Sequence, residues 1–167
     1  MQDLHRIDLL LWQPLGLEYA DGTADLEAKD YHGCTFSIGK TRIIYRKSKI
    51  TPKKSGQFVT LWKRGQNGAT EPFNANDDHF DCCIIAVEHN ENFGVFVFPK
   101  HVLSRHGILQ SGQKAGKRGF RLYSDFDITH NKQAQATRNW QKDFFIPFTD
   151  PNYAKEKFKS IFQQCST

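Results

Sequence analysis

Apolar residues recur at helical spacing near the start of the chain. Leu4, Ile7 and Leu11 share one face of a helix, which predicts a short amphipathic helix over 4–13. Asp3 stands just before this face, where a carboxylate can cap the first turn. We expect this helix to pack its apolar face onto the rest of the fold.

Helical spacing returns in the last third of the chain, over 132–144 and again in the tail. Asp150 and Pro151 are a capping residue and a proline suited to a first turn. The predicted buried face of the tail helix follows at i, i+4, i+7 and i+11, and it comprises Ala154, Phe158, Ile161 and Cys165.

The middle of the chain instead shows short β-type runs broken by glycine, proline and lysine. The expected strands are 35–39, 42–46, 56–63, 80–88, 93–98 and 119–123. Residues 89–92 read as a hairpin loop between two apolar strands. The pattern predicts an α+β fold, with a curved mixed or antiparallel sheet or a pseudobarrel, flanked by N- and C-terminal helices.

Basic and acidic residues are segregated along the sequence. Residues 31–70 and 92–124 contain no carboxylate and hold 15 of the 23 lysines and arginines. Residues 1–30 and 71–91 hold most of the acids, so the formal net charge is only +5. Segregation of this kind can build a surface with one sign of charge, which is the footprint of a protein that meets phosphate.

The first basic segment, 49–64, combines a loop shaped by proline and glycine with an aromatic strand. Trp62 next to Lys63 offers either a stacking face for a base or, as the alternative, a core residue that shares a strand face with Phe58. Candidate contacts to nucleic acid in and around this segment are Arg46, Lys49, Lys53, Lys54, Trp62, Lys63 and Arg64.

The second basic segment, 114–121, places glycines on both sides of Lys117 and Arg118, so that its backbone can approach an anion. A turn over 98–108 adds further basic side chains and the histidines at 101 and 106, which we expect to be solvated. The candidate contacts from these two segments are Lys100, Arg105, Lys117, Arg118 and Arg121.

An enzyme remains an alternative: a metal-dependent nuclease or phosphodiesterase would need carboxylates for a divalent ion and a lysine that assists the attacking water. The candidates are Asp77, Asp78, Asp81, Glu88 and Lys100. His-Asn follows Glu88 where an informative motif would place a lysine, which weakens this case. The sequence indicates no cofactor, no zinc site and no other metal site, and the four cysteines are expected to be reduced structural thiols.

Four ordered blocks resemble one known family. Residues 44–64, 94–103, 116–123 and 137–141 look like the signature segments of the MepB-like family of bacterial proteins. The resemblance covers about 28–146 and implies a fold similar to a DNA-binding pseudobarrel, as in the recognition domains of some restriction enzymes. It therefore implies nucleic-acid binding, and it supplies no catalytic set.

Together these patterns predict a single domain over 1–167, with a family-like core over 28–146 and mainly helical flanks over 1–27 and 147–167. The chain lacks an apolar run that could span a membrane and the layout of a signal peptide, so a cytoplasmic location is expected. The expected partner is nucleic acid, DNA in the first place. A regulatory module whose basic face meets an acidic protein is a further alternative.

Overall fold

A six-stranded mixed sheet forms the centre of the molecule in the computed structural model, which describes residues 2–166. Its strands, in spatial order, are β1 (Tyr19–Ala24), β2 (Cys34–Ile38), β3 (Thr41–Lys47), β8 (Cys82–His89), β9 (Asn92–Pro99) and β11 (Phe145–Pro147). Only β3 and β8 run parallel; the other neighbours are antiparallel. The predicted hairpin between β8 and β9 is confirmed, with His89 opposite Asn92.

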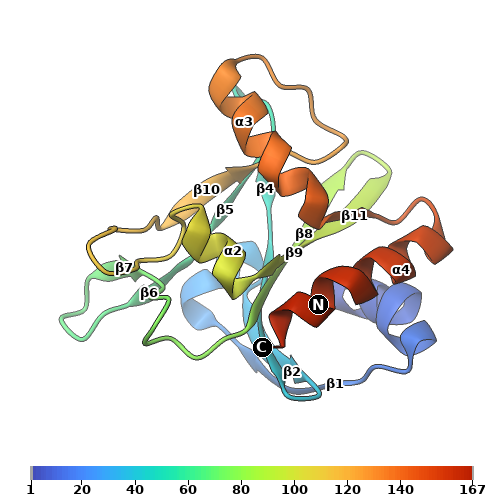
Figure 1. The fold of residues 1–167 in the computed structure, drawn as a ribbon, viewed down its shortest axis with the longest axis horizontal. Helices are drawn as coiled ribbons and strands as arrows, with labels where there is room; N and C mark the ends of the chain where they lie inside the picture. The colour runs from blue at the N-terminus through green and yellow to red at the C-terminus, as the bar shows by residue number, and fades with distance from the viewer. Residues whose placement is uncertain (1, 167) are drawn as a thin grey trace.

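Both terminal helical segments lie on one face of this sheet (Figure 1). The N-terminal segment comprises α1 (Gln2–Ile7), the π-helical turn η1 (Asp8–Trp12) and the 3₁₀ turn η2 (Gln13–Leu15). The C-terminal segment comprises α4 (Pro151–Phe162) and the 3₁₀ turn η5 (Gln163–Cys165). The helical faces predicted from both ends of the sequence are buried in one cluster with the sheet, as expected for amphipathic helices.

The opposite face of the sheet is covered by smaller elements. They are a three-stranded sheet of β10 (Gly119–Leu122), β5 (Gln57–Thr60) and β4 (Lys49–Ile50), a hairpin of β6 (Trp62–Arg64) and β7 (Thr70–Pro72), and the helix α2 (Lys100–Arg105). Further along the chain, α3 (Lys132–Gln141) continues into the 3₁₀ turn η4 (Lys142–Phe144), while η3 (Leu26–Tyr31) links β1 to β2.

Strand β8 shows why its sequence is a continuous apolar run. Cys82 and Ile84 point into the cluster under the terminal helices, whereas Cys83 and Ile85 point into the cluster under the small sheet. Side chains of a strand alternate between faces, and both faces of this strand are covered. All four cysteines of the chain are buried, as expected of structural thiols.

The predicted α+β class is confirmed: a mixed sheet is flanked by helices from both termini, and the strands within residues 2–166 do not close into a barrel. No helix in this part of the chain is long and apolar enough to cross a bilayer.

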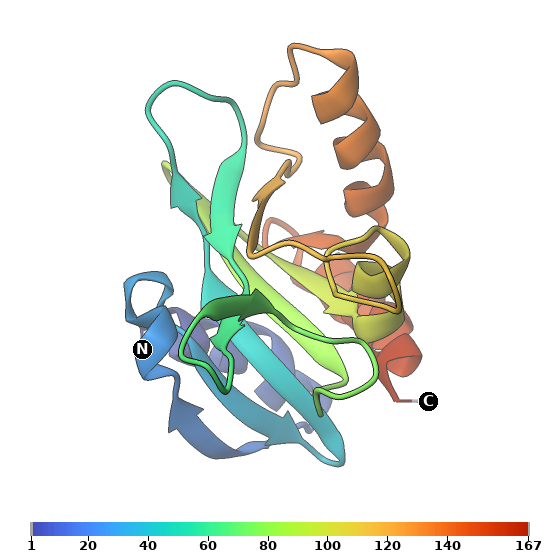
Figure 2. The same cartoon turned by 90° about the vertical axis from the view of Figure 1, so that its left-hand side faces the viewer.

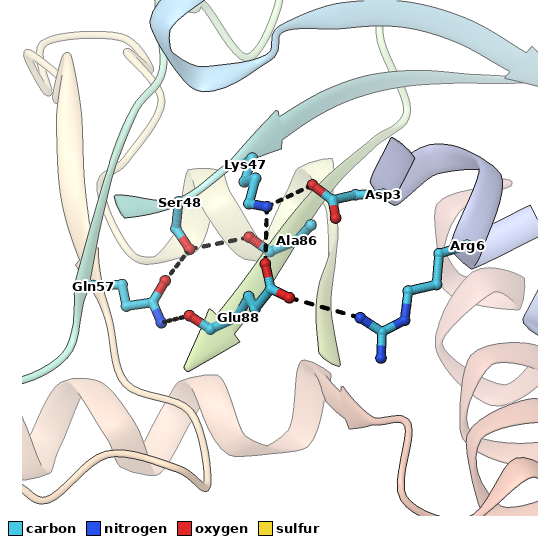
Figure 3. Close-up of polar contacts among 7 residues, drawn as sticks. All are labelled: Asp3, Arg6, Lys47, Ser48, Gln57, Ala86 and Glu88. Carbon is cyan, nitrogen blue, oxygen red and sulfur yellow. Dashed lines mark hydrogen bonds and ion pairs between the residues drawn. The ribbon is translucent and has the colours of Figure 1, made fainter. Parts of the chain in front are cut away.

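Asp3 is not the helix cap that the sequence predicted. The helix α1 already begins at Gln2, and the Asp3 carboxylate lies 2.7 Å from the Lys47 ammonium on β3. Lys47 also contacts Glu88 at 3.1 Å, and Glu88 pairs with Arg6 (Figure 3). Although burial lowers the pKa of Lys47, its hydrogen bonds to these two carboxylates outweigh that effect and raise it. This network ties the N-terminal helix to the ends of β3 and β8.

Candidate nucleic-acid interface

The fold brings the acidic segments of the chain against the basic ones, so that much of the segregated charge is neutralised. Arg42, Arg46, Lys47, Lys63 and Arg64, all from the first basic run, form ion pairs with carboxylates from the acidic runs. The segregation seen along the sequence therefore does not by itself define a basic surface.

Arg46 was predicted to contact phosphate, and the structure contradicts this. Its side chain is 1% exposed, lies 2.6 Å from the Asp25 carboxylate and donates to the backbone carbonyl of Tyr45. Residues 43–46 of β3 are all buried, so this side chain lies in the interior. Arg46 is therefore a buried cation whose charge is balanced by the Asp25 carboxylate.

Lys63 and Arg64 are also occupied. Lys63 lies 2.8 Å from Asp78, and hydrogen bonding to that carboxylate raises the pKa of Lys63. Arg64 forms a bidentate pair with Glu27, with N–O distances of 3.0 and 2.7 Å. Trp62 is half-buried outside the core clusters, beneath the Arg64 guanidinium, so the core alternative for this residue is wrong.

Four further predicted contacts are dispersed and do not meet at one site. Lys100 donates to the backbone carbonyl of Asp78 and lies over the Phe80 ring; burial lowers its pKa, and the nearby acids oppose that shift only in part. Lys49 is exposed, with its ammonium 4.7 Å from the Tyr31 ring centre. Arg118 donates to Thr70, and Arg105 is exposed on α2.

The two predicted loops, by contrast, meet at one groove. A cleft of about 700 Å³ lies between the β4–β5 loop, strand β10 and α3, and Figure 2 shows that loop and helix rising on either side of the strand. Lys53 and Lys54 line it from the first loop, and Lys117 and Arg121 line it from the second. No carboxylate is among the described residues that line it.

The charges of the three lysines are available to a ligand. Lys53, Lys54 and Lys117 are exposed, and none of them forms an ion pair with a residue between positions 2 and 166. Lysines that face one concave surface without a nearby acid raise the local concentration of anions. We name this surface, lined by Lys53, Lys54, Lys117 and the facing side of α3, the basic groove.

Arg121 holds the lysine loop in place. From the outer face of β10 its guanidinium donates to the backbone carbonyls of Ser55 and Gly56 and to the Thr51 hydroxyl, at 2.9 to 3.2 Å. Gly56 completes the turn at φ +73°, where a Cβ atom would lie 2.6 Å from the Leu122 carbonyl oxygen. Arg121 therefore lines the groove mainly as a clamp, and its planar fork of donors suits that task.

A buried amide fixes α3 as the other wall. Gln141 is fully buried; its side-chain oxygen accepts from the Tyr123 amide at 2.8 Å and its nitrogen donates to the Arg121 carbonyl at 2.9 Å. Asn131 caps the start of the helix by accepting from the Ala134 amide. The wall and the clamped loop are thus attached to the same strand, β10.

His106 was expected to be solvated, and the structure corrects this. Its ring stacks on the Trp140 indole, with centroids 4.0 Å apart and planes 8° apart, and both residues line the basic groove. Burial, together with the charge of neighbouring Arg105, lowers the pKa of His106. Trp140 also packs on Phe98 of β9. The two residues are 34 positions apart in the sequence, which explains why no local pattern revealed the stack.

The carboxylates of the nuclease alternative serve other contacts. Asp78 pairs with Lys63 and accepts from the Asn74 amide, Asp81 accepts from the Arg42 amide at 2.8 Å, and Glu88 belongs to the Lys47 network. Asp77 is exposed in the same turn as Asp78. Across residues 2–166, no group of three or more histidine, cysteine or acidic side chains is placed to hold a metal ion.

A family model and one solved structure identify the same family. Residues 25–147 match the model of the MepB-like family. The crystal structure of MepB superposes with a TM-score of 0.76 at 32% identity, covering 79% of this chain and 88% of that one. A bacterial homing endonuclease superposes with a TM-score of 0.43 at 16% identity, covering 76% and 78% of the two chains. No curated protein matches. The matched region contains every residue that lines the basic groove.

Proposed function

The chain belongs to the MepB-like family, and we propose that it binds nucleic acid, with DNA as the expected ligand, through the basic groove. Phosphates of the backbone would contact Lys53 and Lys54 on one side and Lys117 on the other. The proposed function is binding alone, and we assign no residue to catalysis.

One observation supports the proposal above all: the groove is lined by lysines without a carboxylate, in a chain with 18 acidic residues. Elsewhere the fold places acids beside the basic segments, as at Lys63 and Arg64. Phosphate contacts supply most of the affinity in sequence-independent binding, and unpaired lysines are suited to make them.

The lining of the groove favours nucleic acid over an acidic protein as the partner. Phe58, His106 and Trp140 stand among the lysines, so the surface offers π-faces as well as positive charge. Nucleic acid has stacking bases and phosphates and can use both features. An acidic protein surface supplies the negative charge but no regular series of stacking bases.

A cytoplasmic location completes the proposal. Four buried cysteines without disulfide partners suit a reducing compartment. Nucleic acid is accessible in that compartment.

Binding is tested by fluorescence anisotropy with labelled single-stranded and duplex DNA and RNA at low and moderate salt. We expect binding that weakens steeply with salt, because each neutralised phosphate releases counterions. On duplex DNA the logarithm of the binding constant should fall by about 0.9 per contacted phosphate for each unit of log salt. Absence of binding to all four ligands at low salt would refute the proposal. A parallel series with magnesium would reveal cleavage as a loss of signal over time.

A further inference from the structure

The wall formed by His106 and Trp140 indicates which form of nucleic acid the groove accepts. We propose that the basic groove holds an unpaired nucleotide, with its base against the His106–Trp140 stack and its phosphates at the lysines. This inference rests on the proposed function and narrows it: the protein should prefer single strands, or duplexes with an unpaired base, to fully paired duplex.

The stack is a prepared aromatic surface. The two rings are parallel within 8° at a centroid distance of 4.0 Å, and Trp140 is further fixed by its contact with the buried Phe98 ring. His106 stands at the C-terminal end of α2, where its amide donates to the Val102 carbonyl. Flat groups held rigidly at a groove wall lose little freedom when a base stacks on them.

The state of His106 suits a base better than a phosphate. Burial and the Arg105 charge disfavour the imidazolium, so the ring is mainly neutral at neutral pH. A neutral imidazole contributes its π-face, while the positive charge of the groove comes from the lysines that line it. The aromatic and the basic parts of the lining therefore match the base and the phosphates of a nucleotide.

The dimensions of the groove fit the same ligand. Its volume of about 700 Å³ lies in the range of sites that enclose small organic groups. Bases in a paired duplex are covered by their neighbours on both faces, so they reach such a wall only after leaving the stack, which costs free energy. A base that is already unpaired avoids that cost.

Side chains of α3 could read the edge of the bound base. Gln133 and Thr137 follow at i and i+4 on the face of the helix that lines the groove, ahead of Trp140. An amide and a hydroxyl both donate and accept hydrogen bonds, as the edge of a base requires. These two residues stand next to the stacking surface, on the same helix.

The test compares short single-stranded oligothymidine with a paired duplex of the same length and with that duplex carrying one bulged thymidine. For His106→Leu, which keeps Trp140 covered but removes the π-face, we expect affinity for the single strand to fall about tenfold or more. His106→Phe should retain most of the affinity. His101→Ala is the control, since His101 is exposed on α2 and does not line the groove.

A second readout does not depend on substitutions at position 106. In a Trp62→Phe variant two indoles remain: Trp12, which is buried, and Trp140, which lines the groove. Stacking of a base should therefore quench the fluorescence of Trp140 as the single strand saturates the site. Binding of the fully paired duplex as tight as that of the single strand, with no quenching and no effect of His106→Leu, would overturn this inference and leave nucleic-acid binding intact. Failure of all three probes to bind would overturn both.

Discussion

Reversing three charges, Lys53→Glu, Lys54→Glu and Lys117→Glu, is expected to abolish nucleic-acid binding while the protein stays folded. All three lysines are exposed and unpaired with any residue in the described part of the chain, so their replacement should cost little stability. In the groove, however, three attractive charges become repulsive. We expect the apparent dissociation constant at low salt to rise about 100-fold or more, because each phosphate contact contributes to affinity.

A control with the same change in net charge separates the groove from the overall charge of the protein. Lys29→Glu, Lys40→Glu and Lys159→Glu alter exposed lysines that do not line the groove. This control should bind nearly as tightly as the unmodified chain. Equal losses of affinity in the groove variant and in this control variant would show that only net charge matters.

Replacing a groove lysine with neutral glutamine should also lower the salt dependence of binding. On duplex DNA, each such replacement should reduce the slope of log binding constant against log salt by about 0.9.

Among the substitutions proposed, Asp25→Asn is expected to lower the free energy of unfolding most. The Arg46 guanidinium is buried, and Asp25 is its only carboxylate partner among residues 2–166. Asparagine keeps an oxygen that can accept from the Glu27 amide, as Asp25 does, but leaves the interior cation without a counter-charge. Removing one partner of a buried pair costs several kcal/mol, and we expect about 3 kcal/mol because Asp25 itself is partly exposed.

Urea unfolding of the variant measures this loss as a lower midpoint at unchanged slope. Adding Arg46→Met should restore most of the midpoint, because a buried cation is then replaced by an apolar side chain. Glu27→Ala is the matched control: it breaks the exposed pair with Arg64 and should leave the midpoint nearly unchanged. A midpoint for Asp25→Asn equal to that of the unmodified protein would show that Arg46 does not depend on this carboxylate.

The regular elements were predictable because their signals are local. Asp150, Pro151 and the buried face through Phe158 mark the tail helix within one stretch of sequence, and its observed start agrees. The apolar run over 80–88 predicted a strand, and the observed strand β8, Cys82–His89, agrees. Apolar residues repeat about every two positions in a strand and about every 3.6 positions in a helix. These repeats lie within one stretch of sequence, so they predict helices and strands without knowledge of distant contacts.

The groove was predictable only in part, since its geometry depends on contacts between distant segments. Charge and glycine content identified Lys53, Lys54 and Lys117 as basic loop residues, and the fold brings their loops together. Their neighbours Lys63 and Arg64 carry the same local signal, yet each meets a carboxylate from another part of the chain. No local sequence pattern indicates such ion pairs between distant segments.

Occupation of the basic groove by nucleic acid is tested most directly by mapping backbone amide chemical shifts during titration with a short single-stranded oligothymidine. We expect changes concentrated at 51–56, 117–123 and 131–141, with α4 and β1 unaffected. Changes concentrated instead around Lys63, Arg64 and Lys100, or binding that leaves the groove residues unshifted, would contradict it.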